Sequence, residues 1–172
     1  MNSMIELSAE INDQLNTEFY SAYVYLALAA YYEDQNLLGF AHWMKIQVQE
    51  ELAHAGKFYK YINDKGGRVQ LTAIAGPPTH WETAEDGVKE LQEHEALVTK
   101  RIYDLVDCAM DERDHATNIF LQWFVTEQVE EEASAEELLN KVKLVGNSSQ
   151  GLYLLDKELS TRTFTPPAEG AA

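Results

Sequence analysis

Four long amphipathic stretches dominate the sequence, and each carries an ionisable or amide side chain in the middle of its apolar face. Apolar residues recur every three or four positions, which is the spacing of one face of an α-helix. In the second stretch this face includes Met44, Glu51, Phe58 and Ile62. A carboxylate on such a face costs free energy unless it is paired or bound to a metal. The pattern therefore constrains the fold strongly, because the interrupted faces must meet in one core.

The spacing predicts an all-α protein. Helices are expected at about residues 6–33, 37–65, 81–109 and 115–145, with a short fifth helix at about 149–159. The connection at 66–80 is long for a link between antiparallel neighbours, and an extended chain of this length can cross the roughly 40 Å of a flanking helix. We therefore predict a four-helix bundle in which one long crossover joins helices two and three, which run parallel.

Length and charge limit the class of protein. The 172 residues suit one domain, predicted at 1–160, followed by a flexible C-terminal tail at 161–172. A net charge of −16 predicts no binding to nucleic acid or to anionic membranes. No apolar run is long enough to span a bilayer, and the N-terminal residues do not resemble a secretory signal. The single cysteine, Cys108, excludes an internal disulfide, so we expect a cytoplasmic protein.

The polar side chains at the middle of the helices form the candidate site. They are Glu18, Glu51, His54, Glu95, Gln128 and Glu131. In a bundle these midpoints fall at one level, where several unpaired carboxylates would cost more than a domain's stability. No lysine or arginine lies on the apolar faces, so bound cations or protons must compensate the charge. The alternative is that these side chains face water and the bundle is catalytically silent.

The ligand types indicate which metal would bind. Glu51 and His54 are three residues apart, so both can reach one ion from the same helix face. Carboxylates with few imidazoles suit iron or manganese better than a metal that prefers thiolates. A glutamate shared between two ions, here Glu51, would create a two-metal site.

The sequence resembles the non-haem bacterial ferritins, of the ferritin-like diiron superfamily, from about Met4 to Leu159. The most specific segments are 51–55 and 123–132. The resemblance implies a ferroxidase centre with two irons per subunit. One iron would be held by Glu18, Glu51 and His54. The second would be held by Glu51, Glu95 and Glu131, with Gln128 close by.

The resemblance implies further features of the reaction. Tyr25 corresponds to a tyrosine that can supply an electron, although a tyrosine on this face is also an ordinary core residue. Glu50, Glu127 and Glu130 match a third iron site that shares Glu131, although they also fit an acidic solvated face. Iron(II) would be oxidised to iron(III) by dioxygen or hydrogen peroxide. The ferric mineral would be stored inside a hollow shell of 24 identical subunits.

A haem-containing bacterioferritin is the nearest rival within the superfamily. It would need a methionine where Leu52 stands, and helix four carries Gln128-x-x-Glu131 in place of a second Glu-x-x-His. We therefore expect no haem. Animal ferritins place acidic pore residues where this chain has Asn118 and Leu121, which leaves the route of iron into the shell open.

Overall fold

The computed structural model describes residues 2–146 and 148–167, with side chains from Leu7 onward. These residues form five helices: α1 (Asn2–Asp34), α2 (Leu38–Asp64), α3 (Ala84–Asp111), α4 (His115–Val145) and α5 (Ser149–Leu159). The all-α prediction and the number of helices are confirmed, and the described residues include no strand. Helix α3 begins at Ala84, later than predicted, because the Thr83 side chain caps it by accepting a hydrogen bond from the Asp86 N–H.

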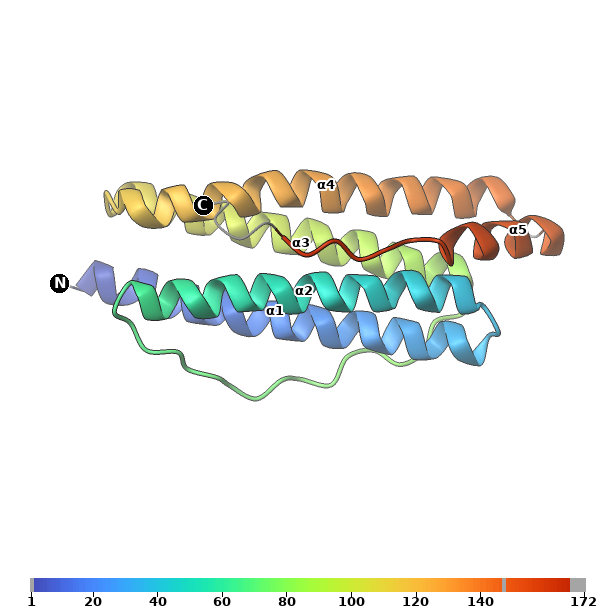
Figure 1. Ribbon diagram of the computed structural model, residues 1–172, viewed down its shortest axis with the longest axis horizontal. Helices are drawn as coiled ribbons and strands as arrows, with labels where there is room; N and C mark the ends of the chain where they lie inside the picture. Colours follow the sequence, from blue (N-terminus) through green and yellow to red (C-terminus); the bar gives the residue numbers. More distant parts are fainter. Residues whose placement is uncertain (1, 147, 168–172) are drawn as a thin grey trace.

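The helices form two antiparallel pairs, α1 with α2 and α3 with α4 (Figure 1). The crossover (residues 65–83) runs the length of the bundle, so that α2 and α3 point the same way, as predicted (Figure 1). Two asparagines one turn apart tie it to α1. The Gln70 and Thr72 N–H groups donate to Asn12 and Asn16 at 2.8 and 2.9 Å. These bonds satisfy backbone groups that an irregular segment would otherwise leave unpaired.

The core is divided into two apolar clusters. The first includes Tyr25, Phe40 and Leu138 and lies toward the end of the bundle that carries α5. The second includes Leu15, Phe58 and Ile102 and lies toward the opposite end. The polar residues at the middle of the helices lie between these clusters in the sequence of each helix. The fold therefore places hydrophobic packing on both sides of one polar layer.

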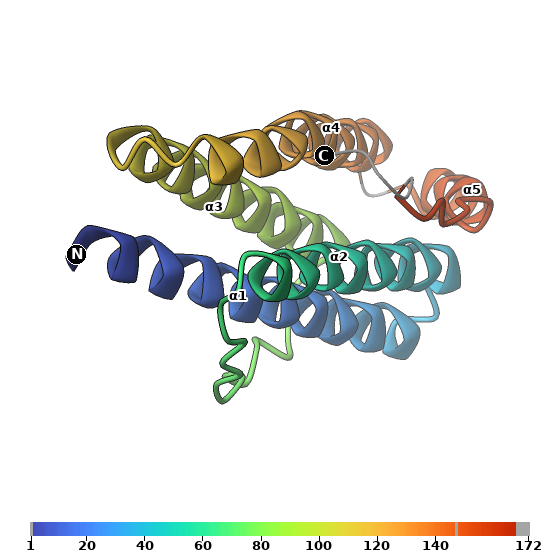
Figure 2. The same ribbon diagram turned by 60° about the vertical axis from the view of Figure 1, so that its left-hand side comes forward.

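Helix α5 is held against the start of α2 at one end of the bundle (Figure 2). Oδ1 of Asp156 accepts hydrogen bonds from the Gly39 and Phe40 N–H groups at 2.7 and 3.0 Å. These are first-turn donors of α2, which have no partner inside the helix. A Cβ atom at Gly39 would lie 1.6 Å from the Asp156 carbonyl oxygen, so only glycine allows this approach.

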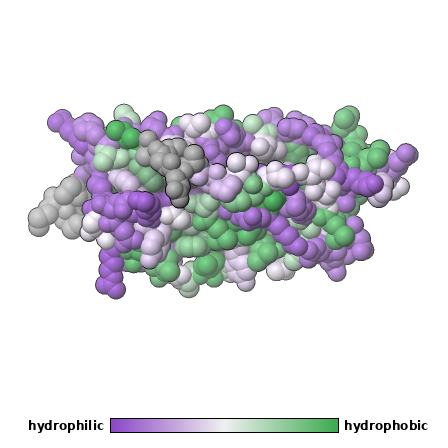
Figure 3. All heavy atoms as spheres, viewed as in Figure 1, coloured by the Kyte–Doolittle hydropathy of each residue, from purple (hydrophilic) through white to green (hydrophobic). Residues whose placement is uncertain are grey.

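The surface carries exposed hydrophobic side chains beside the charged ones. Figure 3 shows hydrophobic side chains gathered over α2 and the crossover, between hydrophilic edges. Exposed large residues on α1, α2 and the crossover include Tyr23, Leu26, Leu52, Tyr59 and Leu71. Patches of this kind often mark surfaces that contact another protein. Among the described residues, none of the helices is long and apolar enough to cross a bilayer.

Candidate metal centre

All six predicted side chains of the polar layer are buried. The most exposed of them, Glu131, retains 6 % of its surface, while Glu18 and Glu95 retain 1 % each. The prediction that these residues face the interior is therefore confirmed. The alternative arrangement, in which they face water, is excluded. Among the described side chains, the buried charged groups include no lysine or arginine.

Glu18, Glu51 and His54 converge on one point. Each offers a ligand atom, and these atoms lie within 4.8 Å of one another. Nδ1 of His54 lies 3.5 Å from Oε2 of Glu51. Oε2 of Glu18 and Oε2 of Glu51 are buried without a hydrogen-bond partner. Because buried carboxylate oxygens are normally paired, these two orphaned atoms indicate a place for a cation.

The imidazole of His54 also faces a second acidic group. Its Nε2 lies 3.7 Å from Oε1 of Glu127, and ligand atoms of His54, Glu127 and Glu131 lie within 4.8 Å of one another. The ring packs edge-on against Trp123 and Phe124, with centroids 5.5 and 5.9 Å away. These aromatic contacts hold the ring between the two groups of carboxylates.

Glu95 is engaged differently from the other acids. The Tyr25 hydroxyl donates to its Oε1, and Nε2 of Gln128 donates to its Oε2 at 3.2 Å. Nε2 of Gln128 also lies 3.1 Å from the Thr99 hydroxyl. Among the described residues, Glu51, Glu95 and Glu131 do not form a three-residue group as close as the two groups above. Their joint role as ligands of a second iron stays a prediction.

Two buried glutamines were missed by the sequence analysis. Nε2 of Gln14 donates to Oε1 of Glu18 at 2.8 Å, and Nε2 of Gln47 donates to Oε2 of Glu131 at 2.9 Å. Gln14 lies one turn before Glu18, and Gln47 lies one turn before Glu51 on the same helix face. That spacing is the signal that could have identified them. Both residues fix carboxylates of the layer, and Gln47 leaves its own Oε1 unpaired.

The three residues predicted for a third iron site occupy different environments. Oε2 of Glu50 accepts a hydrogen bond from Nη2 of Arg162 at 2.7 Å. Glu127 is half-buried beside His54, whereas Glu130 is exposed on α4. Arg162 lies in the segment predicted to be a tail, whose last residues, 168–172, fall outside the described part of the chain. The predicted boundary at residue 160 stays a prediction.

Burial and mutual repulsion shift the pKa values of the layer. Burial, reinforced by the charge of Glu131, raises the pKa of Glu95 to about 8. Burial also raises the pKa values of Glu51 and Glu131. For His54 burial acts to lower the pKa, but the Glu51 carboxylate and Glu127 outweigh it and raise the pKa well above its ordinary value. Protons therefore supply positive charge in the layer, and a bound metal ion would displace them.

The tyrosine and the outermost acid follow the same physical causes. Burial, followed by the charges of Glu95 and Glu51, raises the pKa of Tyr25 well above its ordinary value. Its hydroxyl thus stays protonated and donates to Glu95. Burial raises the pKa of Glu50 to about 7, although the adjacent Arg162 guanidinium opposes the shift.

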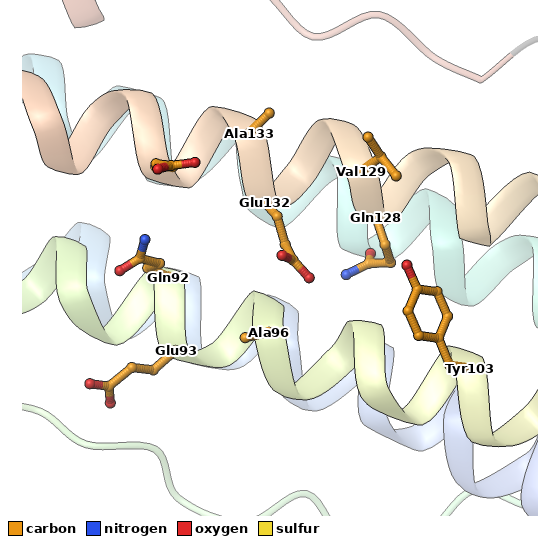
Figure 4. Close-up of a pocket in the computed structure, with 9 residues that line it drawn as sticks. Gln92, Glu93, Ala96, Tyr103, Gln128, Val129, Glu132 and Ala133 are labelled. Atoms are coloured by element: carbon orange, nitrogen blue, oxygen red, sulfur yellow. The ribbon is translucent and has the colours of Figure 1, made fainter.

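A groove of about 490 Å³ between α3 and α4 reaches the edge of the layer (Figure 4). Gln128 and Glu132 point from α4 toward α3, and the Tyr103 hydroxyl lies beside Gln128 (Figure 4). Gln128 thus belongs both to the wall of the groove and to the hydrogen bonds of Glu95. Glu93, Glu132 and Glu136 make the groove acidic, which favours the approach of cations.

The arrangement suits a hard cation. It offers several carboxylate oxygens and one imidazole, a set that matches iron or manganese by ligand type. The orphaned oxygens of Glu18 and Glu51 show that this donor set fits a metal, since a cation would complete their coordination.

Comparisons with known proteins agree with this geometry. The model of the family described as Ferritin-like domain matches residues 8–145. Among curated relatives, the bacterial non-heme ferritin of Staphylococcus saprophyticus is 44 % identical over 163 residues, covering 92 % of this chain and 95 % of its own. The protein of the same name from Staphylococcus aureus strain MRSA252 is 41 % identical over 154 residues, covering 90 % of this chain and 93 % of its own.

Solved structures show the same fold. An engineered closed form of the Archaeoglobus fulgidus ferritin superposes with a TM-score of 0.92 at 48 % identity, covering 93 % of this chain and 98 % of that one. The open-pore ferritin of the same archaeon gives a TM-score of 0.91 at 47 % identity, covering 92 % of this chain and 98 % of that one.

Proposed function

The chain belongs to the ferritin family and stores iron, and from this premise we propose that its buried polar layer is a ferroxidase centre. The reaction would oxidise iron(II) to iron(III) before the ferric ion is stored as mineral. One observation carries the proposal. Ligand atoms of Glu18, Glu51 and His54 meet within 4.8 Å in the buried core, and two of the carboxylate oxygens there have no hydrogen-bond partner.

We assign two iron positions to the centre. The first is held by Glu18, Glu51 and His54. The second is held by Glu51, Glu95 and Glu131, with Gln128 as a neighbour. Burial of these residues in one layer supports the second position, and Gln47 supports it by orienting Oε2 of Glu131. Carboxylate ligands stabilise the ferric state because the more highly charged ion gains more from anionic oxygens, which favours loss of an electron to the oxidant.

A third position would use Glu50, Glu127 and Glu130 together with Glu131. The short distance between the ligand atoms of Glu127, Glu131 and His54 supports part of this set. Glu130 is exposed and would have to turn toward the site. A third iron would supply an additional electron, since reduction of dioxygen to two waters takes four electrons and two ferrous ions supply only two.

Tyr25 is proposed as a source of a further electron. Its hydroxyl donates a hydrogen bond to Oε1 of Glu95, a proposed ligand of the second iron. When the phenol loses an electron, its proton can pass along this bond to the Glu95 carboxylate, so that no charge is left unpaired in the core. Burial of Tyr25 keeps solvent away from the oxidised ring.

The oligomer and the oxidant complete the proposal. Exposed hydrophobic side chains on α1, α2 and the crossover support contacts between subunits, and we propose a shell of 24 copies. The substrates would be iron(II) and either dioxygen or hydrogen peroxide, and the compartment the cytoplasm. The curated relatives are named non-heme ferritins, and Leu52 offers no atom that ligates haem iron, so we propose two irons per centre without haem.

Stopped-flow absorbance after mixing with iron(II) in air tests the ferroxidase centre. Glu51→Ala and Glu95→Ala should each slow the fast oxidation phase by at least about 100-fold, because each removes a ligand that charge-stabilises the ferric product. Asp107→Asn is the matched control, since Asp107 is an exposed acid on α3 that does not line the groove. Full rates in both alanine variants would exclude this site.

A further inference from the structure

The chain after α5 turns back along the bundle (Figure 1), and Arg162 in this segment contacts α2. The Arg162 guanidinium lies over the Trp43 ring, 4.1 Å from its centroid, and Nη1 donates to the Trp43 carbonyl oxygen at 3.4 Å. The backbone carbonyl oxygen of Arg162 lies 2.7 Å from Nε2 of His42. Arg162 is thus held from both its backbone and its side chain.

The held guanidinium is paired with a carboxylate. Nη2 of Arg162 lies 2.7 Å from Oε2 of Glu50, and the two side chains retain only 21 % and 19 % of their surface. A hydrogen bond between two ionised groups is stronger than a neutral one, and partial burial reduces its screening by water and salt. Stacking on an aromatic ring adds to the preference for arginine at this position.

The position of this pair relates it to iron. Glu50 is next to Glu51 in α2, and the charges of Glu131 and Glu127 act on Glu50. These are the acids proposed above for a third iron. The fold therefore brings a permanent positive charge from the C-terminal segment to the acids that would bind that ion.

We propose that Arg162 competes with iron for the Glu50 carboxylate, so that the third iron position fills only when the C-terminal segment releases Glu50. This inference rests on the proposed function. The guanidinium occupies Oε2 of Glu50 and neutralises the negative charge that a metal ion at this carboxylate would need, and two cations at one carboxylate repel each other. Binding of iron and docking of Arg162 thus oppose each other, and each weakens the other by the same factor.

Calorimetric titration of the metal-free full-length assembly with Zn²⁺, which undergoes no oxidation, separates binding from turnover. In Arg162→Gln the weakest class of zinc sites should bind on the order of tenfold more tightly, because a charge-assisted hydrogen bond no longer has to be broken. The tighter sites should keep their Kd. Arg162→Lys retains a cation at Glu50 and should stay within about twofold of the unaltered protein. Lys100→Gln removes one positive charge from the exposed surface and controls for net charge.

A second background tests whether the effect passes through Glu50. The gain in Arg162→Gln should disappear when it is combined with Glu50→Gln. The proposal is overturned if Arg162→Gln binds zinc no more tightly than the unaltered protein, if Arg162→Lys shows the same gain, or if the gain persists without Glu50. Gel filtration and circular dichroism verify that each variant keeps its assembly and helix content.

The outcomes distinguish this proposal from the ferroxidase function. An unaltered protein that binds no zinc would refute the buried metal centre and this proposal together. A different result would overturn only the role of Arg162. In that case the tight zinc sites would depend on Glu51, but the Kd of the weak class would not change in the Arg162 variants.

Discussion

Replacing Glu95 by glutamine should stabilise the metal-free protein, with a gain that grows with pH. The pKa of Glu95 lies near 8 in the folded protein and near 4.5 when exposed. Between these values the unfolded chain loses the proton while the folded chain keeps it, so stability falls as pH rises from 4.5 to 8 and is constant above. Each pKa unit corresponds to about 1.4 kcal/mol, so ionisable Glu95 costs about 3 kcal/mol at pH 7 and about 5 kcal/mol at pH 9.

The substitution does not recover all of this free energy. A glutamine at position 95 can still accept the hydrogen bond from Tyr25, but its amide nitrogen would face the amide of Gln128, which now donates to Oε2. Losing that bond costs about 1 kcal/mol. The expected net gain for Glu95→Gln is therefore about 2 kcal/mol at pH 7 and about 4 kcal/mol at pH 9.

Guanidinium unfolding in the presence of a chelator, followed by far-ultraviolet circular dichroism at pH 5, 7 and 9, measures the effect. Glu93→Gln, the exposed neighbour, should leave the free energy of unfolding within about 0.5 kcal/mol of the unaltered protein. Added Zn²⁺ should reverse the order, since Glu95→Gln removes an anionic ligand. The reasoning is refuted if metal-free Glu95→Gln is no more stable than the unaltered protein at pH 9, or if its advantage does not increase from pH 5 to pH 9.

Four further variants probe the helix packing, the histidine next to Glu95 and the tyrosine. Gly39→Ala should displace α5 and destabilise the chain by at least about 2 kcal/mol, because its Cβ would overlap the Asp156 carbonyl. Gly56→Ala is the control: it has open space around it and should stabilise α2 by about 0.5–1 kcal/mol. Equal unfolding midpoints for the two variants would contradict this prediction. Burial lowers the pKa of His94 from 6.5 to about 4, so the unfolded chain takes up a proton at a higher pH than the folded one. The unaltered protein should therefore lose about 3 kcal/mol of folding stability between pH 6.5 and 4, a loss that His94→Gln avoids. Parallel pH profiles of the two proteins in denaturant titrations would argue against this prediction. Tyr25→Phe should bind zinc normally but lose any tyrosyl radical signal in electron paramagnetic resonance after oxidation, and an undiminished signal would assign the radical to another residue.

The helices and the inward-facing acids could be predicted from the amino-acid pattern alone. Apolar residues recur every three to four positions in each helix and form one apolar face. A glutamate on that face is buried when the face packs into the core, as Glu18 and Glu95 are. The crossover could also be predicted, because a connection of this length is long enough to run the length of the bundle and join α2 to a parallel α3. Glu51 and His54 also followed from spacing, since residues three apart lie on one helix face, whereas their grouping with Glu18 was implied by the resemblance to ferritins.

The hydrogen-bond partner of each acid could not be predicted in this way, because it depends on how the helices pack together. Gln47 and Glu131 are 84 positions apart, and Arg162 and Glu50 are 112 apart, so no local period links them. Such pairs depend on how two helices are shifted along each other and on their side-chain rotamers. The hydrophobic pattern specifies neither. Periodicity predicts which residues enter the core. Long-range hydrogen bonds, which form only when the helices pack together, determine which carboxylate oxygens stay unpaired and available to a metal ion.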